Sequence, residues 1–368
     1  MKRIIALLLS VFIMISMVAG CASGDNNVVA QTNSPVAIPT STPATVPTST
    51  PAAISTPDVD DELEDTEDHD SRSEKRYDEE TGLPVVFFTT EITPESLIAI
   101  YNALGAEPTG NIAIKIHTGE SQRSNHLRPE LIGDLVRLIG GTLVETNTAG
   151  GQRARSATHM QIVKDHGFFD LAPFDLLDAD GEISLPINVG EVLSEVLVGV
   201  NVPNYDYYVV LSHFKGHASA GYGGAIKNIA IGLASAPGKS LIHSGGTRRT
   251  GYTGSNQERF LKGMSEAMAG ILDHIGEENF LYINVMNRLS VDCDCMSNPA
   301  QPDMHDIGIL ASFDPVALDQ ACIDLVYAAS DGASLIRRIE ARRGLITLEH
   351  SADIGLGSRE YVLVSLDD

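Results

Sequence analysis

The residues from about Leu83 to Asp368 alternate short apolar strands with helices, and this alternation constrains the fold more than any other feature. Strands interleaved with helices are typical of a parallel sheet that helices cover. We therefore predict an α/β fold with a largely parallel sheet and helices on both faces, as one domain or two intimately joined lobes. Ligands in such folds bind beyond the carboxyl ends of the strands. The expected strands are 85–88, 112–116, 142–145, 207–211 and 280–285.

Local signals place several helix ends. Thr93 and Asp314 each precede a proline, so they are expected to cap helices that begin with that proline. Gly140 and Gly141 should end the helix that opens at 128–130. The further expected helices are 157–167, 258–275 and 315–329.

The residues between the first twenty and the α/β domain are unsuited to forming a core. Residues 23–57 are rich in Pro, Thr and Ser, which favours an extended, semi-rigid chain. Residues 58–80 form an acidic run that repels itself and stays solvated, and it contains no spaced calcium-binding loop. We predict a disordered tether over 21–82. The formal net charge of −24 argues against nucleic acid as a partner.

Residues 1–20 have the parts of a secretory signal: a basic start, an apolar run at 4–18 and small residues before Cys21. The apolar run is shorter than the ~20 residues that a spanning helix needs. The sequence VAGC at 18–21 resembles the lipobox of bacterial lipoproteins, and an ordinary signal peptide with an incidental cysteine is the alternative. The resemblance implies lipidation of Cys21, with palmitate as a bound acyl group. It also implies anchoring to the extracytoplasmic face of the cell membrane, with the lipid as the only contact with the bilayer.

The densest group of reactive side chains lies in HFKGHASAGYGGAIKN, residues 213–228. Histidines and lysines flank glycines, whose backbone N–H groups can converge on an anion. A helix at 225–233 would favour an anion at its N-terminus. We expect a small anionic ligand here, with metal binding by the histidines or a mobile surface loop as alternatives. The catalytic candidates are His213, Lys215, His217 and Lys227, and the ligand-binding candidates are Gly221, Gly223, Gly224 and Asn228.

A second candidate site is Cys293-Asp294-Cys295. Two thiolates this close can hold one soft metal ion, whereas a disulfide between them would close a small strained ring. Charge repulsion from the neighbouring aspartates is expected to raise the pKa of both thiols. Downstream, Asp303 and His305 are the remaining metal-ligand candidates. The alternative is an acidic turn with two incidental thiols.

The other cysteines limit the cofactor. Cys322 lies among apolar residues of the expected helix 315–329, so a buried structural role is predicted. Because the chain has 4 cysteines and Cys21 is expected to be lipidated, an odd number remains. An odd number excludes complete disulfide pairing, and the remainder is too small for a four-cysteine iron–sulfur cluster.

Polar residues also follow other strands. Lys115 and His117 end the expected strand 112–116 and His126 follows, which makes Lys115 a ligand-binding candidate, although a surface position would explain these residues equally well. The carboxylates of FDLLDADGE, residues 174–182, more simply form a turn.

Three segments resemble the domain-of-unknown-function 362 family, whose members are often labelled uncharacterised iron–sulfur centre proteins. The segments are LSHFKGHASAGYGGAIKN, INVMNRLSVDCDC and DIGILASFDPVALDQACIDLVYAA. The resemblance covers nearly all of 83–368, in a lipoprotein form without the appended ferredoxin module of many relatives. It implies a metal ion or an iron–sulfur centre, for which Cys293 and Cys295 match the family's Cys-Asp-Cys segment.

The run from His217 to Lys227 also resembles the glycine-rich loop of nickel-pincer lactate racemases. That resemblance implies hydride movement at a hydroxy-acid carbon, with a histidine as general base and Lys227 stabilising negative charge. Three functions therefore remain open. The first is a metal-containing protein that binds a small anionic ligand and, if it is an enzyme, catalyses a redox or hydrolytic reaction. The second is a racemase or isomerase. The third is a non-catalytic solute-binding lipoprotein.

Overall fold

The computed structural model describes residues 76–251 and 256–367, which all fall in one compact unit. Its centre is an 8-stranded sheet with the order β12-β1-β11-β10-β7-β2-β3-β4. Adjacent strands run parallel except where β11 pairs antiparallel with β1 and β10. The sheet strands are β1 (Val85–Thr89), β2 (Ile112–Lys115), β3 (Thr142–Glu145), β4 (Phe174–Leu176), β7 (Tyr207–His213), β10 (Phe280–Met286), β11 (Gly308–Ser312) and β12 (Val362–Ser365).

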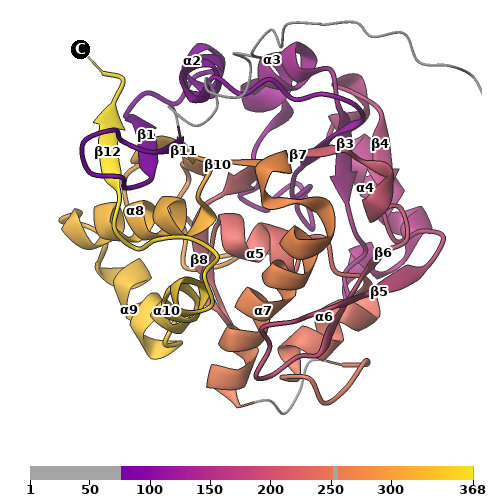
Figure 1. Cartoon of the computed structure of the whole chain (residues 1–368). Helices are drawn as coiled ribbons and strands as arrows, with labels where there is room; N and C mark the ends of the chain where they lie inside the picture. Colours follow the sequence, from indigo (N-terminus) through magenta and orange to yellow (C-terminus); the bar gives the residue numbers. More distant parts are fainter. Residues whose placement is uncertain (1–75, 252–255, 368) are drawn as a thin grey trace, which may run out of the picture. The chain divides into compact units, whose positions relative to one another are not determined.

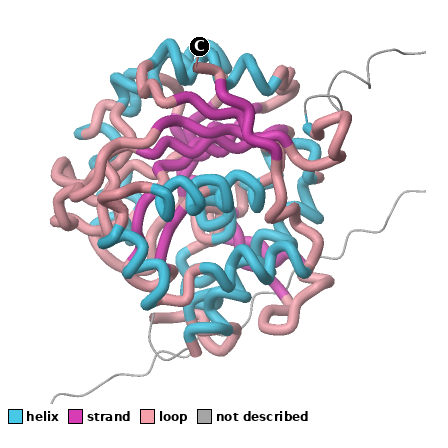
Figure 2. The backbone as a smooth tube through the Cα atoms, turned by 90° about the vertical axis from the view of Figure 1, so that its left-hand side faces the viewer, coloured by secondary structure: helices cyan, strands magenta, loops and turns pink. Residues whose placement is uncertain are grey.

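Helices cover both faces of this sheet, as Figures 1 and 2 show, so the predicted α/β architecture is confirmed. One face carries α2 (Pro94–Leu104), α3 (Pro129–Ile139) and α4 (Ser156–Asp165). The other face carries α5 (Ala225–Ala230), α6 (Ala236–His243), α7 (Gln257–Ile275), α8 (Pro315–Ala328), α9 (Ala333–Ala341) and α10 (Leu345–Asp353). Short 3-10 helices within the described part of the chain are η1 (Gln152–Ala154), η2 (Phe168–Asp170), η3 (Val202–Asn204) and η4 (Glu277–Asn279).

Strand alternation explains why both faces need helices. Side chains of successive strand residues point to opposite faces of a sheet. In β10, Leu281, Ile283 and Val285 pack into the core under α2 and α3, whereas Phe280, Tyr282 and Met286 pack into the core under α5 and α8. Apart from Asn284, the strand is therefore apolar, as strands buried on both faces are.

The expected helix caps are confirmed. The Thr93 side chain accepts from the backbone N–H of Ser96, and Asp314 accepts from two N–H groups at the start of α8. Gly140 ends α3 in a left-handed conformation that glycine adopts without steric cost. No described helix is long and apolar enough to cross a membrane.

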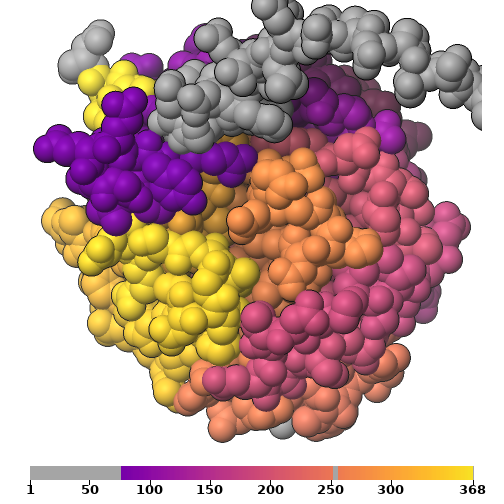
Figure 3. Space-filling model, in the orientation of Figure 1, coloured from indigo at the N-terminus to yellow at the C-terminus, as the bar shows by residue number. Residues whose placement is uncertain are grey.

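Other elements were not predicted. Residues 215–223 form a hairpin of β8 (Lys215–His217) and β9 (Gly221–Gly223) instead of a loop, and a second hairpin pairs β5 (Glu182–Pro186) with β6 (Glu195–Gly199). Strand β12 pairs with β1, so the C-terminal residues lie against the first described strand (Figure 3). Contacts begin before Leu83, since the Arg76 guanidinium stacks over the Phe313 ring at 4.1 Å. The expected signal peptide with Cys21, and the part of the expected tether up to residue 75, lie outside the described residues.

Candidate functional site

A cavity of about 460 Å³ lies beyond the carboxyl ends of β2, β3 and β7. Lys115 ends β2, Glu145 ends β3 and His213 ends β7, and all three line the cavity. Neighbouring parallel strands bring their carboxyl ends to one edge of the sheet, which is where ligands bind in open α/β sheets. The volume falls within the roughly 300–1,000 Å³ typical of small-molecule sites.

The turn that carries the two cysteines is held against the end of β7 by Asp294. The buried Asp294 carboxylate accepts from Nδ1 of His213 at 2.9 Å and from Nζ of Lys215 at 2.9 Å. Nε2 of His213 hydrogen-bonds with the carbonyl of Asn287 at 2.7 Å, so both ring nitrogens of His213 have hydrogen-bond partners. These charges hold the pKa of Asp294 well below its usual value although burial opposes this. Asp294 therefore anchors the Cys-Asp-Cys turn.

The anchored turn places both sulfur atoms beside His217, which belongs to β8. One nitrogen of His217 and the Sγ atoms of Cys293 and Cys295 all lie within 4.8 Å of one another. Among the described residues, this is the group of His, Cys, Asp and Glu side chains that could hold a metal ion. Cys293 is buried, whereas Cys295 is exposed and lines the cavity.

The hydrogen bonds of His217 limit its role. Its Nδ1 accepts from the backbone N–H of Ser219 at 3.2 Å and of Ala220 at 2.9 Å, so the ring proton is on Nε2. A metal-binding histidine normally keeps a proton on the nitrogen that does not bind the metal. Here a metal on Nε2 would leave the ring without a proton. The two sulfurs are therefore the better ligands, and His217 is the donor beside them.

The expected rise in the pKa of both thiols is wrong for Cys293. A hydrogen bond from Cys295, the charge of Lys227 and a hydrogen bond from His217 hold the pKa of the Cys293 thiol well below its usual value. The neighbouring aspartates do not oppose this, since Asp294 is paired inside the protein and Asp292 pairs with Arg338. The pKa of Cys295 is raised because it donates to Cys293 and is desolvated.

Several lysines give the cavity its charge. Lys115 and Lys239 are buried, which lowers the pKa of Lys115 to about 7 and that of Lys239 to about 8. Their Nζ atoms donate to neutral oxygens and not to carboxylates. Across the described residues, Lys227 Nζ makes no hydrogen bond or ion pair, and it lines the same cavity. Lys227 and Lys239 are therefore cationic side chains without carboxylate partners, which favours an anionic ligand.

Another part of the cavity wall is formed by a buried network of charged and polar side chains around Arg153. Its guanidinium donates to Glu120 at 3.1 Å, to Glu145, and to Nε2 of His117 at 3.1 Å. Burial lowers the pKa of His117 well below its usual value, and the charge of Arg153 adds to this. Arg153 therefore balances the two carboxylates on this wall, which leaves the lysines free to attract an anion.

Comparison with known proteins identifies the family. The profile described as "Domain of unknown function (DUF362)" matches residues 112–324, more than half of the chain. The chain belongs to this family. Every residue that lines the cavity lies within the matched DUF362 region. No curated protein matches the chain.

Two solved structures share part of the fold. The lactate racemase apoprotein from Thermoanaerobacterium thermosaccharolyticum is 14% identical with a TM-score of 0.37, covering 68% of this chain and 58% of that one. A protein from Thermotoga maritima is 12% identical with a TM-score of 0.37, covering 71% of this chain and 58% of that one. The chain thus spans less than two thirds of the length of either. At this similarity neither structure lends an activity to this DUF362 protein, and the racemase alternative is not favoured.

The structure does not bring His305 or Asp303 to the cysteines. His305 is exposed and its Nδ1 pairs with Asp331 at 2.8 Å, away from the turn. The group that could hold a metal contains His217 instead and includes neither of these residues. The downstream metal ligands expected from the sequence are therefore wrong, because the chain after Cys295 leads to the surface before it enters β11.

The glycine-rich segment is also built differently from the sequence expectation. Asp319 of α8 accepts from the N–H groups of Ala225 and Ile226, so a side chain of the protein occupies the N-terminus of α5 and leaves no place for an anion there. Gly223 and Gly224 line the cavity. Gly221 is not among the lining residues; its φ is positive, and the absence of a side chain lets β9 pack closely on Gly344 and Ile339.

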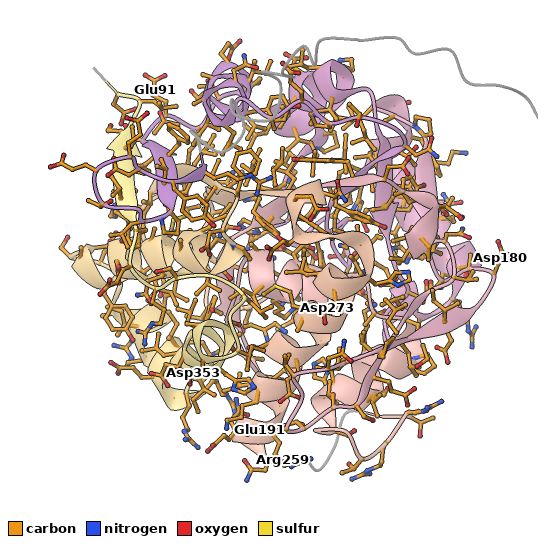
Figure 4. The ribbon with its side chains drawn as sticks, viewed as in Figure 1. Glu91, Asp180, Glu191, Arg259, Asp273 and Asp353 are labelled. Carbon is orange, nitrogen blue, oxygen red and sulfur yellow. The ribbon has the colours of Figure 1, made fainter. Side chains whose placement is uncertain are left out.

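Other candidates take structural positions. Buried His126 stacks on His166 with ring centroids 4.6 Å apart and does not line the cavity. Cys322 is buried in the core as expected and accepts from Asn284. Of the carboxylates in 174–182, Asp178 and Asp180 lie in a turn after β4, whereas Asp175 belongs to β4 and Glu182 begins β5; Asp180 points outward (Figure 4).

Sequence reasoning missed Arg153, Glu145 and Lys239. Each is charged and buried in the cavity wall, but nothing in the sequence around Arg153 or Lys239 sets it apart from other polar residues. The one available signal was position, because Glu145 ends an expected strand in the same way as Lys115.

Proposed function

We propose that this DUF362 protein holds a soft metal ion through Cys293 and Cys295 and binds a small organic anion beside it in the same cavity. The observation that carries the proposal is the convergence of two sulfur atoms with His217 at the wall of a cavity in which three lysines have no carboxylate partner, whereas the fourth, Lys215, pairs with Asp294. Thiolate sulfur selects soft or borderline ions such as zinc, copper(I) or iron. Two protein thiolates leave coordination positions open for water or for the anion.

The anion would lie between the metal and the lysines. Cys295 and Lys227 line the same cavity, and Lys227 has an ammonium with no partner among the described side chains. A carboxylate or phosphate that reaches Lys227 gains a charge-assisted hydrogen bond. Lys215 is a poorer partner because Asp294 already holds it.

Replacing Lys227 with methionine is expected to weaken anion binding by about 10–100-fold, the effect of losing one hydrogen bond to a charged group. Isothermal titration of the full chain with pyruvate and with inorganic phosphate measures the affinity. The matched control is Lys164→Met, because Lys164 is exposed on α4, outside the cavity. An equal loss of affinity in both variants, or no binding of either anion to the unchanged protein, would contradict the proposed anion site.

We further propose that this chemistry takes place on the extracytoplasmic side of the membrane, where the lipid on Cys21 anchors the protein. The support is the VAGC sequence that follows the basic and apolar N-terminal segments. Cys21→Ser is expected to move the protein from the membrane fraction to the soluble fraction of a bacterial host. Retention of the variant in the membrane fraction would contradict the lipid anchor.

A further inference from the structure

The lysines that line the cavity differ in how many hydrogen-bond acceptors surround each ammonium. Lys215 pairs with Asp294. Nζ of Lys239 donates to three oxygens, those of Thr146, Asn147 and Ala234, so all three of its N–H bonds are used. Nζ of Lys227 has no partner among the described residues. Lys115 alone among these four has two acceptors.

The surroundings of Lys115 suit a neutral amine. Nζ donates to the carbonyl of Ile116 and to Oδ1 of Asn228, the latter at 2.9 Å. The amide of Asn228 cannot turn round, because its Nδ2 donates to the carbonyl of Leu211 and to Oγ of Ser212. Two N–H bonds therefore satisfy both acceptors and leave the fourth position of the nitrogen for a lone pair.

Space beside this nitrogen is kept by Gly232. A Cβ atom at position 232 would lie 1.9 Å from the carbonyl oxygen of Asn228 and 2.7 Å from Nζ of Lys115, and Gly232 lines the same cavity. A side chain there would cover the amine. The glycine thus leaves Lys115 open to a molecule in the cavity.

The charges around Lys115 also favour the uncharged form of its amine. Burial lowers its pKa to about 7, Glu145 opposes this, and the charges of Lys239, Arg153 and Lys227 lower it further. A large fraction of Lys115 is then uncharged at neutral pH. Amines that are desolvated and lie near another cation are the ones that attack carbonyl groups.

We propose that Lys115 forms an imine with a small carbonyl compound that carries a carboxylate or phosphate group, such as a 2-oxo acid. This inference rests on the proposed anion cavity, where Lys227 holds the anionic group. The Nζ lone pair attacks the carbonyl carbon, the two amine protons leave with the carbonyl oxygen as water, and a C=N bond remains. No oxidant or reductant is needed.

Reductive trapping tests this assignment. The full chain is incubated with pyruvate or with pyridoxal 5′-phosphate in the presence of sodium cyanoborohydride, which converts an imine to a stable secondary amine. Peptide mass spectrometry then locates the adduct. We expect an adduct on Lys115 of the unchanged protein at several times the level on any other lysine, with Lys239 unmodified. Its rate should rise with pH through about 7, as Lys115 loses its proton.

Two variants separate the contribution of the Lys115 amine from that of the anion contact at Lys227. Lys115→Met should abolish the dominant adduct. Lys227→Met should slow adduct formation more with pyruvate than with acetone, which has a carbonyl and no charge, because loss of the Lys227 charge raises the pKa of Lys115 for both probes but removes an anion contact only for pyruvate. If both probes bind the unchanged protein and neither modifies Lys115, the imine proposal is wrong while the anion cavity stands. Equal modification of surface lysines would also overturn it. If neither probe binds, the proposed anion site fails.

Discussion

Replacing Cys293 and Cys295 together with serine is expected to abolish stoichiometric metal binding by the anaerobically prepared full chain. Serine hydroxyls stay protonated at neutral pH and are hard oxygen donors, so the variant loses both the negative charge and the soft sulfur that a zinc ion binds. The affinity for added zinc should fall by more than the roughly 10–100-fold that removal of a residue outside the ligand set produces. Titration with zinc, followed by metal analysis of the desalted protein, measures both quantities.

Two single variants make this prediction specific. Cys322→Ala removes the remaining thiol of the described residues, which lies in the core and away from the cavity, and it should leave zinc binding unchanged. His217→Gln should keep the stoichiometry and lower the affinity by about 10–100-fold, as expected for a group that only donates to the sulfur. Complete loss of zinc binding in His217→Gln would instead show that His217 is a metal ligand. It would contradict the role inferred from the two backbone N–H groups that donate to its Nδ1.

The second large effect is expected on stability, from Asp294→Ala. The side chain of Asp294 is fully buried between Lys215 and the His213 ring, and its removal leaves their charges without a partner. Breaking a buried pair in this way costs about 3–5 kcal/mol, because the remaining charge is desolvated and uncompensated. The free energy of unfolding, obtained from urea denaturation, should fall by this amount.

The control for Asp294 is a similar pair on the surface. Asp331 pairs with His305 at 2.8 Å, but both side chains are exposed, so Asp331→Ala should barely change the urea midpoint. A loss below about 1 kcal/mol in Asp294→Ala would show that the buried charges find other partners and that Asp294 does not anchor the turn.

The architecture of the site could be predicted from the sequence because its parts follow strands. The apolar segments 112–116, 142–145 and 207–211 became β2, β3 and β7, which pair in parallel. Polar residues that follow such strands meet at one edge of the sheet. The position of Lys115 and of the segment 213–228 at one cavity follows from this rule.

The partner of the cysteines could not be predicted because it depends on strand order. His305 is the nearer histidine in sequence to Cys295, whereas His217 is far away. β7 and β10 are adjacent parallel strands, with His213 opposite Val285, so the segments that follow them lie together. A backbone hydrogen bond of 2.8 Å from Gly216 to Ser290 fixes this contact. Periodicity locates strands but does not order them.

The charge state of the site depends on burial, which residue types do not reveal. The expectation for the thiols counted Asp292 and Asp294 as free negative charges. In the structure Asp294 is neutralised by side chains from β7 and β8, and Lys227 lies near Cys293 instead. Arg153 shows the same limit, since its pairing with Glu120 and Glu145 links η1 to two other segments.

Cobalt(II) spectroscopy of the anaerobic full chain tests the central claim most directly. Cobalt replaces zinc at thiolate sites and reports sulfur ligands through charge-transfer absorption. We predict that one equivalent of cobalt gives thiolate charge-transfer bands, that these bands change when pyruvate or phosphate is added, and that Cys293→Ser with Cys295→Ser removes them. Absence of the bands in the unchanged protein would contradict the metal site. If calorimetry shows that the anion binds but the bands do not change, the claim that the metal and the anion share one cavity is contradicted.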